Sequence, residues 1–109
     1  MIERGDIEFG TFEHANPQTT AELVQTFDDN IVAVRAALQK VSDESLKEVF
    51  HLKNQGQILF SAEKEDNIPA TIRHWIHHRG QLTVYMRLNN LLVPSVYGPS
   101  ADEKSFELT

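Results

Sequence analysis

Hydrophobic residues recur at helical spacing in two long stretches of the chain. In the first stretch, apolar side chains fall three or four residues apart from Leu23 to Val41, which places them on one face of an amphipathic helix. Thr19 is suited to the N-cap because Glu22 follows it three residues later, as in a capping box. The pattern therefore predicts a helix over residues 19–41.

The second helical stretch covers residues 68–92 and is the longest in the chain. Pro69 is expected in its first turn, where the missing N–H would have no partner in any case. Gly80 in the helix interior costs about 1 kcal/mol relative to alanine, and the close approach of a neighbouring helix is the expected compensation. Trp75 of this helix and Phe27 of the first one are expected to pack in the core.

The segment between the two helices predicts extended structure. The sequence VFHLKNQGQILF at residues 49–60 has two short apolar runs on either side of the tripeptide NQG at 54–56, which is the pattern of a β-hairpin turn. Before this segment, Ser42 interrupts the helical pattern, and a short helical turn is expected to run from there through Glu48.

The composition is that of a small soluble domain. The chain has 109 residues, of which 40% are hydrophobic and 24% charged, as in ordinary globular proteins. We expect a single domain over residues 1–109, with an irregular lead-in at 1–18 and a C-terminal loop at 93–109. No apolar run is long enough to cross a bilayer, and the first residues lack the apolar region of a signal peptide. The expected location is therefore the cytoplasm, without a membrane partner.

Charge and residue usage narrow the chemistry. The formal net charge is −6, which disfavours nucleic acid as a partner because phosphate contacts require a basic excess. The chain has no cysteine, so it has no disulfide, thiolate metal site or cysteine nucleophile. Glycine-rich phosphate loops and the serine nucleophile elbow are absent as well. These features assign neither a catalytic residue nor a small-molecule substrate.

The most informative segment is HWIHHR at residues 74–79. His74 and His78 are four residues apart, so their Cβ atoms would lie about 5–6 Å apart on one helix face, with His77 at the edge of that face. Two imidazoles at this spacing suit a divalent ion, and they favour zinc, nickel, iron or copper over magnesium or calcium. A zinc centre needs at least three protein ligands. The spacing alone therefore leaves open a metal half-site or ordinary surface histidines.

Residues beside the histidines also have two interpretations. Gln81 and Tyr85 continue the face of the histidine pair, either as groups that orient the ligands or as residues that face a neighbouring helix. Arg79 and Arg87 would either pair with the acidic residues at 102–103, which would lock the C-terminal loop, or bind a ligand.

The same region resembles a known family. The stretches HWIHHRGQL at 74–82, YMR at 85–87 and PSVYGPSADE at 94–103 closely resemble the C-terminal signature of the DinB family. This family and its YfiT-like relatives are bacterial metal-binding four-helix bundles. The resemblance extends more loosely to the helix at 23–41 and the extended segment at 49–60. It implies an all-α fold, namely a DinB-like helical bundle with two long helices per chain and a short extended segment.

The resemblance also implies a metal site at the centre of the bundle. In the family, one histidine from an early helix and two from the late helix bind a divalent ion, and the late pair corresponds to His74 and His78, with His77 between them. The implied cofactor is zinc, nickel or iron. Some relatives are metal-dependent hydrolases or thiol transferases, and many have no assigned activity.

The sequence departs from the family pattern at its start. The helix that supplies the first metal histidine has no counterpart, and His14 does not replace that ligand because it falls beyond this helix. The chain is therefore expected to be an N-terminally shortened form. Two long helices cannot enclose a four-helix core, so their apolar faces are expected to be half exposed in one chain. We expect a homodimer that completes the bundle about a two-fold axis and brings His74 and His78 of both chains to a shared site.

Three functional hypotheses follow. The chain is a metal-binding DinB-like protein with hydrolase, thiol transferase or unassigned activity; or it is a non-catalytic helical dimerisation domain with a degenerate metal site; or a natural partner supplies the missing helices. A third protein ligand within about 2.0–2.2 Å of a metal held by His74 and His78 would distinguish the first hypothesis from the second.

Overall fold

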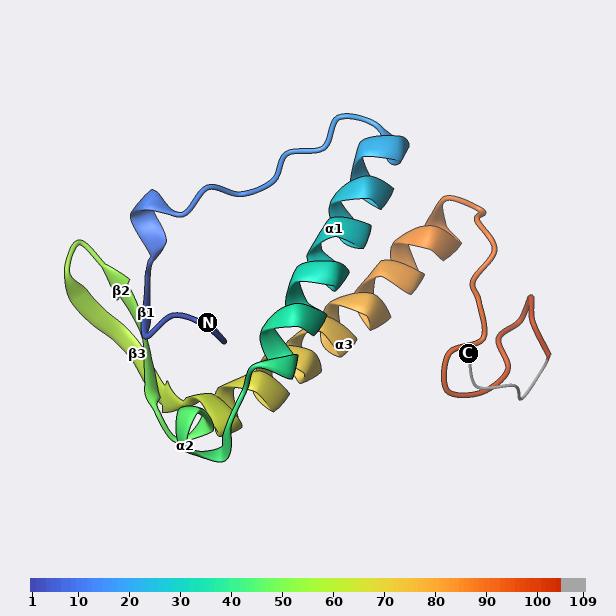
Figure 1. The fold of residues 1–109 in the computed structure, drawn as a ribbon. Coiled ribbons are helices and arrows are strands. Elements are labelled where there is room, and N and C mark those ends of the chain that lie inside the picture. The colour runs from blue at the N-terminus through green and yellow to red at the C-terminus, as the bar shows by residue number, and fades with distance from the viewer. Residues whose placement is uncertain (105–109) are drawn as a thin grey trace. The chain divides into compact units, whose positions relative to one another are not determined.

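The computed structural model describes residues 1–104, and the chain divides into two compact units. The units comprise Met1–Pro69 and Ala70–Thr109, and helix α3 (Lys64–Leu88) contributes to both. Figure 1 shows the order of the elements along the chain. Each unit is described by itself below.

The first unit contains a three-stranded mixed sheet, and the expectation of an all-α bundle is therefore wrong. Strands β1 (Asp6–Glu8), β2 (Val49–Asn54) and β3 (Gln57–Glu63) lie in the order β1-β2-β3 (Figure 1). Strand β1 pairs with β2 in parallel, and β2 pairs with β3 in antiparallel fashion. In addition to this sheet, the described residues form three α-helices, so a four-helix bundle is not supported for this chain.

The hairpin forms where the sequence predicted it, because the NQG turn permits a tight reversal. Gln55 and Gly56 have φ angles of 51° and 76°, as the two central residues of a type I′ turn require. The carboxylate of Glu8 accepts hydrogen bonds from both of their backbone N–H groups. Strand β1 is thereby tied to the turn as well as to β2, and a 3-10 turn at Phe9–Thr11 follows it.

Helix α1 (Thr20–Gln39) confirms the first predicted helix. Thr19 is its N-cap and accepts a hydrogen bond of 3.2 Å from the backbone N–H of Glu22. The Glu22 carboxylate reaches back to the backbone N–H of Gln18 at 2.7 Å, one residue before the cap. The short helix α2 (Asp43–Leu46) follows, with Ser42 as its N-cap.

Helix α3 begins earlier than the periodicity indicated. Its first residue is Lys64, whose backbone N–H donates to the carbonyl of Glu48 at 3.0 Å. Pro69 therefore lies inside the helix rather than in its first turn. The helix ends in a left-handed cap: Asn90 has a φ of 55°, and the N–H of Leu91 donates to the carbonyl of Met86 at 2.9 Å.

Few apolar side chains are buried in the described chain. The buried hydrophobic residues are Ala37 and Phe50. Phe27 and Trp75, expected in the core, are 62% and 61% exposed, so that expectation is wrong for the single chain, while half-exposed apolar helix faces are confirmed. No helix within residues 1–104 combines the length and apolarity needed to cross a membrane.

Candidate metal centre

The histidine pair lies on α3 within the second unit. The side chains of His74 and His78 converge, with their Nε2 atoms 2.6 Å apart and their ring centroids 4.5 Å apart. The separation of four residues places both on one face, one helical turn apart. Both side chains are exposed. The sequence prediction that these two imidazoles share a face is therefore met by the geometry.

Gln81 contacts the histidine pair through His78. The Nδ1 atom of His78 lies 2.9 Å from Oε1 of Gln81, and an amide oxygen only accepts hydrogen bonds, so Nδ1 carries the proton. In neutral His78 the lone pair is then on Nε2, where it accepts the Nε2–H of His74. Gln81 thus lies in contact with the histidine pair, as the role of a group that orients the ligands would require.

The geometry between the two rings suits a proton better than a metal in this conformation. A tetrahedral ion held at 2.0–2.1 Å would separate two nitrogen ligands by about 3.3 Å, compared with the 2.6 Å observed. A metal would replace the shared proton and would require the rings of His74 and His78 to move apart by less than about 1 Å. Exposed side chains on a helix surface make such a shift by small rotamer changes.

Within the described residues, no third metal-binding side chain joins the pair. Among residues 1–104, no three His, Cys, Asp or Glu side chains are grouped closely enough to hold a metal ion. His77 contacts His78 edge to face, with the ring centroids 5.3 Å apart. The two remaining histidines have other neighbours: His14 contacts the ring of Phe12, and Nδ1 of His51 lies 2.6 Å from Oγ of Ser61. The part of the chain that the structure describes therefore offers two converging imidazole donors and no third ligand beside them.

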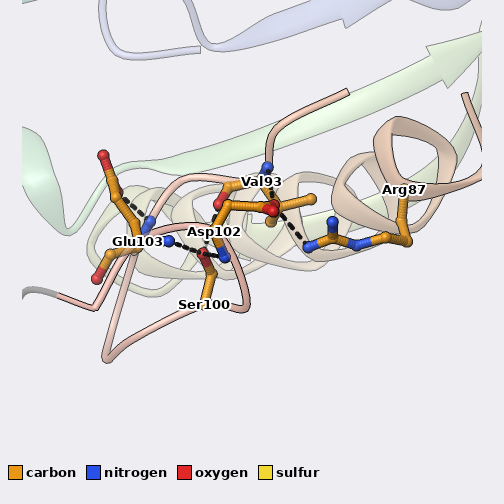
Figure 2. Close-up of polar contacts among 6 residues, drawn as sticks. Arg87, Val93, Ser100, Asp102 and Glu103 are labelled. Carbon is orange, nitrogen blue, oxygen red and sulfur yellow. Dashed lines mark hydrogen bonds and ion pairs between the residues drawn. The ribbon is translucent and has the colours of Figure 1, made fainter. Parts of the chain in front are cut away.

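The C-terminal loop is attached to the last turns of α3 by a carboxylate. Asp102 accepts an ion-paired hydrogen bond from Arg87 at 2.8 Å and another from the backbone N–H of Val93 at 2.9 Å (Figure 2). These two hydrogen bonds hold the pKa of Asp102 below its ordinary value of 3.8, and the bond from Arg87 has the larger effect. The pairing of Arg87 with an acidic residue at 102–103, one of the two roles left open, is thus observed.

Ser100 is the centre of the same loop, and the sequence reasoning missed it. Its hydroxyl donates to the carbonyl of Val93 at 2.6 Å and accepts from the backbone N–H groups of Asp102 and Glu103 (Figure 2). The Glu103 carboxylate accepts from the N–H of the buried Ser95. A serine two and three residues before acidic residues is a known local capping pattern, and this was the available signal.

For Arg79, pairing with an acidic residue, one of the two roles left open, is not observed among residues 1–104, and Gly80 differs from expectation. The Arg79 guanidinium lies 5.1 Å from the ring centroid of Tyr97 rather than beside an acidic residue. A Cβ atom added to Gly80 would meet nothing within 4 Å, so within the described residues no neighbouring helix approaches this position. The close-approach explanation for Gly80 is therefore not supported.

Comparison with known proteins identifies the family. The model of the DinB family matches residues 11–106, and the chain belongs to this family. A similar curated protein is the uncharacterized protein YrdA of Bacillus subtilis (strain 168), which is 56% identical over 32 residues. That match covers 29% of this chain and 19% of YrdA, so the matched segment spans less than a fifth of the relative. No solved structure matches the chain.

Proposed function

We propose that this DinB-family protein binds a divalent transition-metal ion through the Nε2 atoms of His74 and His78. The observation that carries the proposal is the convergence of these two nitrogens, with the lone pair of His78 directed by Gln81. Two neutral imidazoles favour zinc, nickel or iron over magnesium or calcium. A bound ion of this kind supplies Lewis acidity, which is the chemistry of a metal-dependent hydrolase or thiol transferase.

The remaining ligands come, in this proposal, from a second copy of the chain. The helix face that carries the histidines also carries large exposed apolar side chains, with Leu82 57% and Tyr85 64% exposed. Burying such a face against its own copy about a two-fold axis would bring a second histidine pair toward the first. Four imidazoles would complete a tetrahedral site.

The number of protein ligands on the metal distinguishes a catalytic site from a structural site that holds two chains together. A site with four protein ligands has no open position and is structural, whereas three protein ligands leave a position for substrate. The second candidate function is therefore a helical dimerisation domain in which the metal, or the apolar face alone, holds the chains together. The exposure of the apolar residues on both long helices is the observation that favours it.

Metal titration of untagged protein tests the proposal. After chelation, zinc and nickel are added separately and binding is followed by calorimetry, with elemental analysis of the dialysed protein. We expect one ion per two chains for a shared site, and an affinity loss of at least about tenfold in His74→Ala and in His78→Ala. His77→Ala is the matched control and should keep its affinity, because His77 only flanks the pair.

Two further results would decide the assignment. Sedimentation of the metal-free and metal-loaded protein should show a dimer that the ion stabilises. Equal metal binding by the wild type and the His74→Ala, His78→Ala double variant would refute the metal proposal. A dimer that persists without any metal binding would favour the assembly function instead.

A further inference from the structure

A groove of about 250 Å³ lies within the second unit, between α3 and the C-terminal loop. Gly80 of the helix lines it, and because Gly80 follows His78 by two residues, it lies on nearly the opposite side of α3 from the histidine pair. The groove is therefore separate from the candidate metal centre. Its apolar wall is formed by five side chains: Ile76, Pro94, Val96, Tyr97 and Pro99.

One cationic group lines this apolar groove. Arg79 lies over the ring of Tyr97, and it has no salt bridge to any acidic residue within 1–104. Two helical turns further on, Arg87 is paired with Asp102 instead. The contact with Tyr97 is a cation–π contact, and a guanidinium also has five N–H donors suited to a carboxylate.

Gly80 lines this groove without a side chain. Glycine inside a helix is unfavourable relative to alanine, and no packing contact explains it here, since a Cβ would enter open space. A methyl group at this position would extend into open space, and Gly80 is one of the residues that line the groove. The cost of the glycine is thus accounted for if the groove has to admit a ligand.

We propose that this groove binds a small monocarboxylate with an apolar body, such as an aryl or branched-alkyl acid. The carboxylate would pair with the guanidinium of Arg79 in two parallel hydrogen bonds, and the apolar body would lie against Tyr97 and the two prolines. A single cation favours one negative charge over a phosphate dianion. The volume of about 250 Å³ is below that of sites for drug-sized ligands, which favours a small ligand.

Benzoate is the probe, and benzamide is its neutral counterpart of the same shape. Each is titrated into isotope-labelled, metal-free protein in the presence of a chelator, and amide shifts are followed by NMR. We expect benzoate to shift Gly80 and Tyr97 with about millimolar affinity and benzamide to bind at least about tenfold more weakly. Arg79→Gln should weaken benzoate binding by a similar factor. Arg73→Gln, the matched control on the same helix but outside the groove, should not.

Gly80→Ala gives a test in which stability and binding move in opposite directions. The substitution should raise Tm by about 4–8 °C, because alanine favours the helix, and it should weaken benzoate binding several-fold. Equal binding of benzoate and benzamide, or unchanged benzoate affinity in Gly80→Ala, would overturn the proposal. If that variant does not fold, loss of benzoate affinity is measured in Arg79→Gln and Tyr97→Leu instead. None of these outcomes depends on whether His74 and His78 bind metal.

Discussion

The Oδ2 atom of Asp102 lies 2.8 Å from Nη2 of Arg87 and accepts the backbone N–H of Val93 at 2.9 Å with the same oxygen. One carboxylate oxygen thus joins the last turn of α3 to the start of the loop that follows it. Asp102→Asn removes the charge that strengthens both bonds. We expect hydrogen exchange of the Val93 amide to accelerate several-fold while the amides of α1 keep their rates.

A matched control separates this local effect from a change in net charge. Glu13→Gln removes a negative charge from an exposed side chain in the first unit and should leave Val93 exchange unchanged. If Asp102→Asn and Glu13→Gln had the same effect, the pairing of Asp102 would not be what holds the loop.

The same carboxylate makes the loop sensitive to acid. In the folded chain the pKa of Asp102 lies below its ordinary value of 3.8, so folding favours the charged carboxylate. The charged carboxylate therefore stabilises the fold fully at pH values above the pKa of the unfolded chain. That stabilisation is lost as the pH falls through the lowered folded pKa. The Val93 amide shift should therefore titrate with a midpoint below 3.8, and in Arg87→Gln the midpoint should move upward. A midpoint at or above 3.8 in the wild type would contradict the assignment.

The hairpin turn offers a test of backbone conformation. Both Gln55 and Gly56 have positive φ angles, which asparagine tolerates better than glutamine and which glycine adopts without steric cost. We expect Gln55→Asn to stabilise the chain by about 0.5 kcal/mol and Gly56→Ala to destabilise it by about 1 kcal/mol or more. Urea unfolding of the two variants beside the wild type measures both. A stabilising Gly56→Ala would exclude this turn type.

The base of the hairpin carries a buried lysine. The side chain of Lys64 is 5% exposed, and its Nζ lies 2.7 Å from a carboxylate oxygen of Glu48, whose side chain is 61% exposed. Glu48→Ala leaves a buried ammonium without its acceptor and should cost about 1–2 kcal/mol. Lys64→Met should be close to neutral, because it removes the charge along with the need for a partner.

A double-mutant cycle completes this test. In the Glu48→Ala, Lys64→Met variant the loss should be smaller than in Glu48→Ala alone, since the unpaired charge is gone. Strict additivity of the two unfolding free energies would show that the ion pair makes no net contribution.

Features set by neighbours in the sequence could be predicted. The N-cap at Thr19 and the NQG turn depend on residues within a few positions of each other, and both appear as expected. Strand β1 could not be predicted, because its residues pair with positions about 45 further along, such as Asp6 with His51. A strand of three residues is too short for its alternation to be distinguished from irregular structure.

In the candidate site, too, features set by neighbours in the sequence could be predicted, and features set by distant residues could not. The convergence of His74 and His78 follows from helical spacing alone, and Gln81 lies one turn further along the same face. The groove beside Arg79 could not be predicted, because it depends on how the loop after α3 folds back. Only the structure shows that Tyr97, rather than an acidic residue, lies under the guanidinium.

The C-terminal loop that carries Asp102 is held closed by hydrogen bonds between residues that are near each other in the sequence. Its main hydrogen bonds, Ser100 to Val93, Glu103 to Ser95 and Asp102 to Val93, join residues seven, eight and nine positions apart. Loops of about ten residues close within roughly 10–100 ns, far faster than strands separated by dozens of residues find their register. During folding, we therefore expect this C-terminal segment to close soon after the end of α3 forms and before β1 joins the sheet.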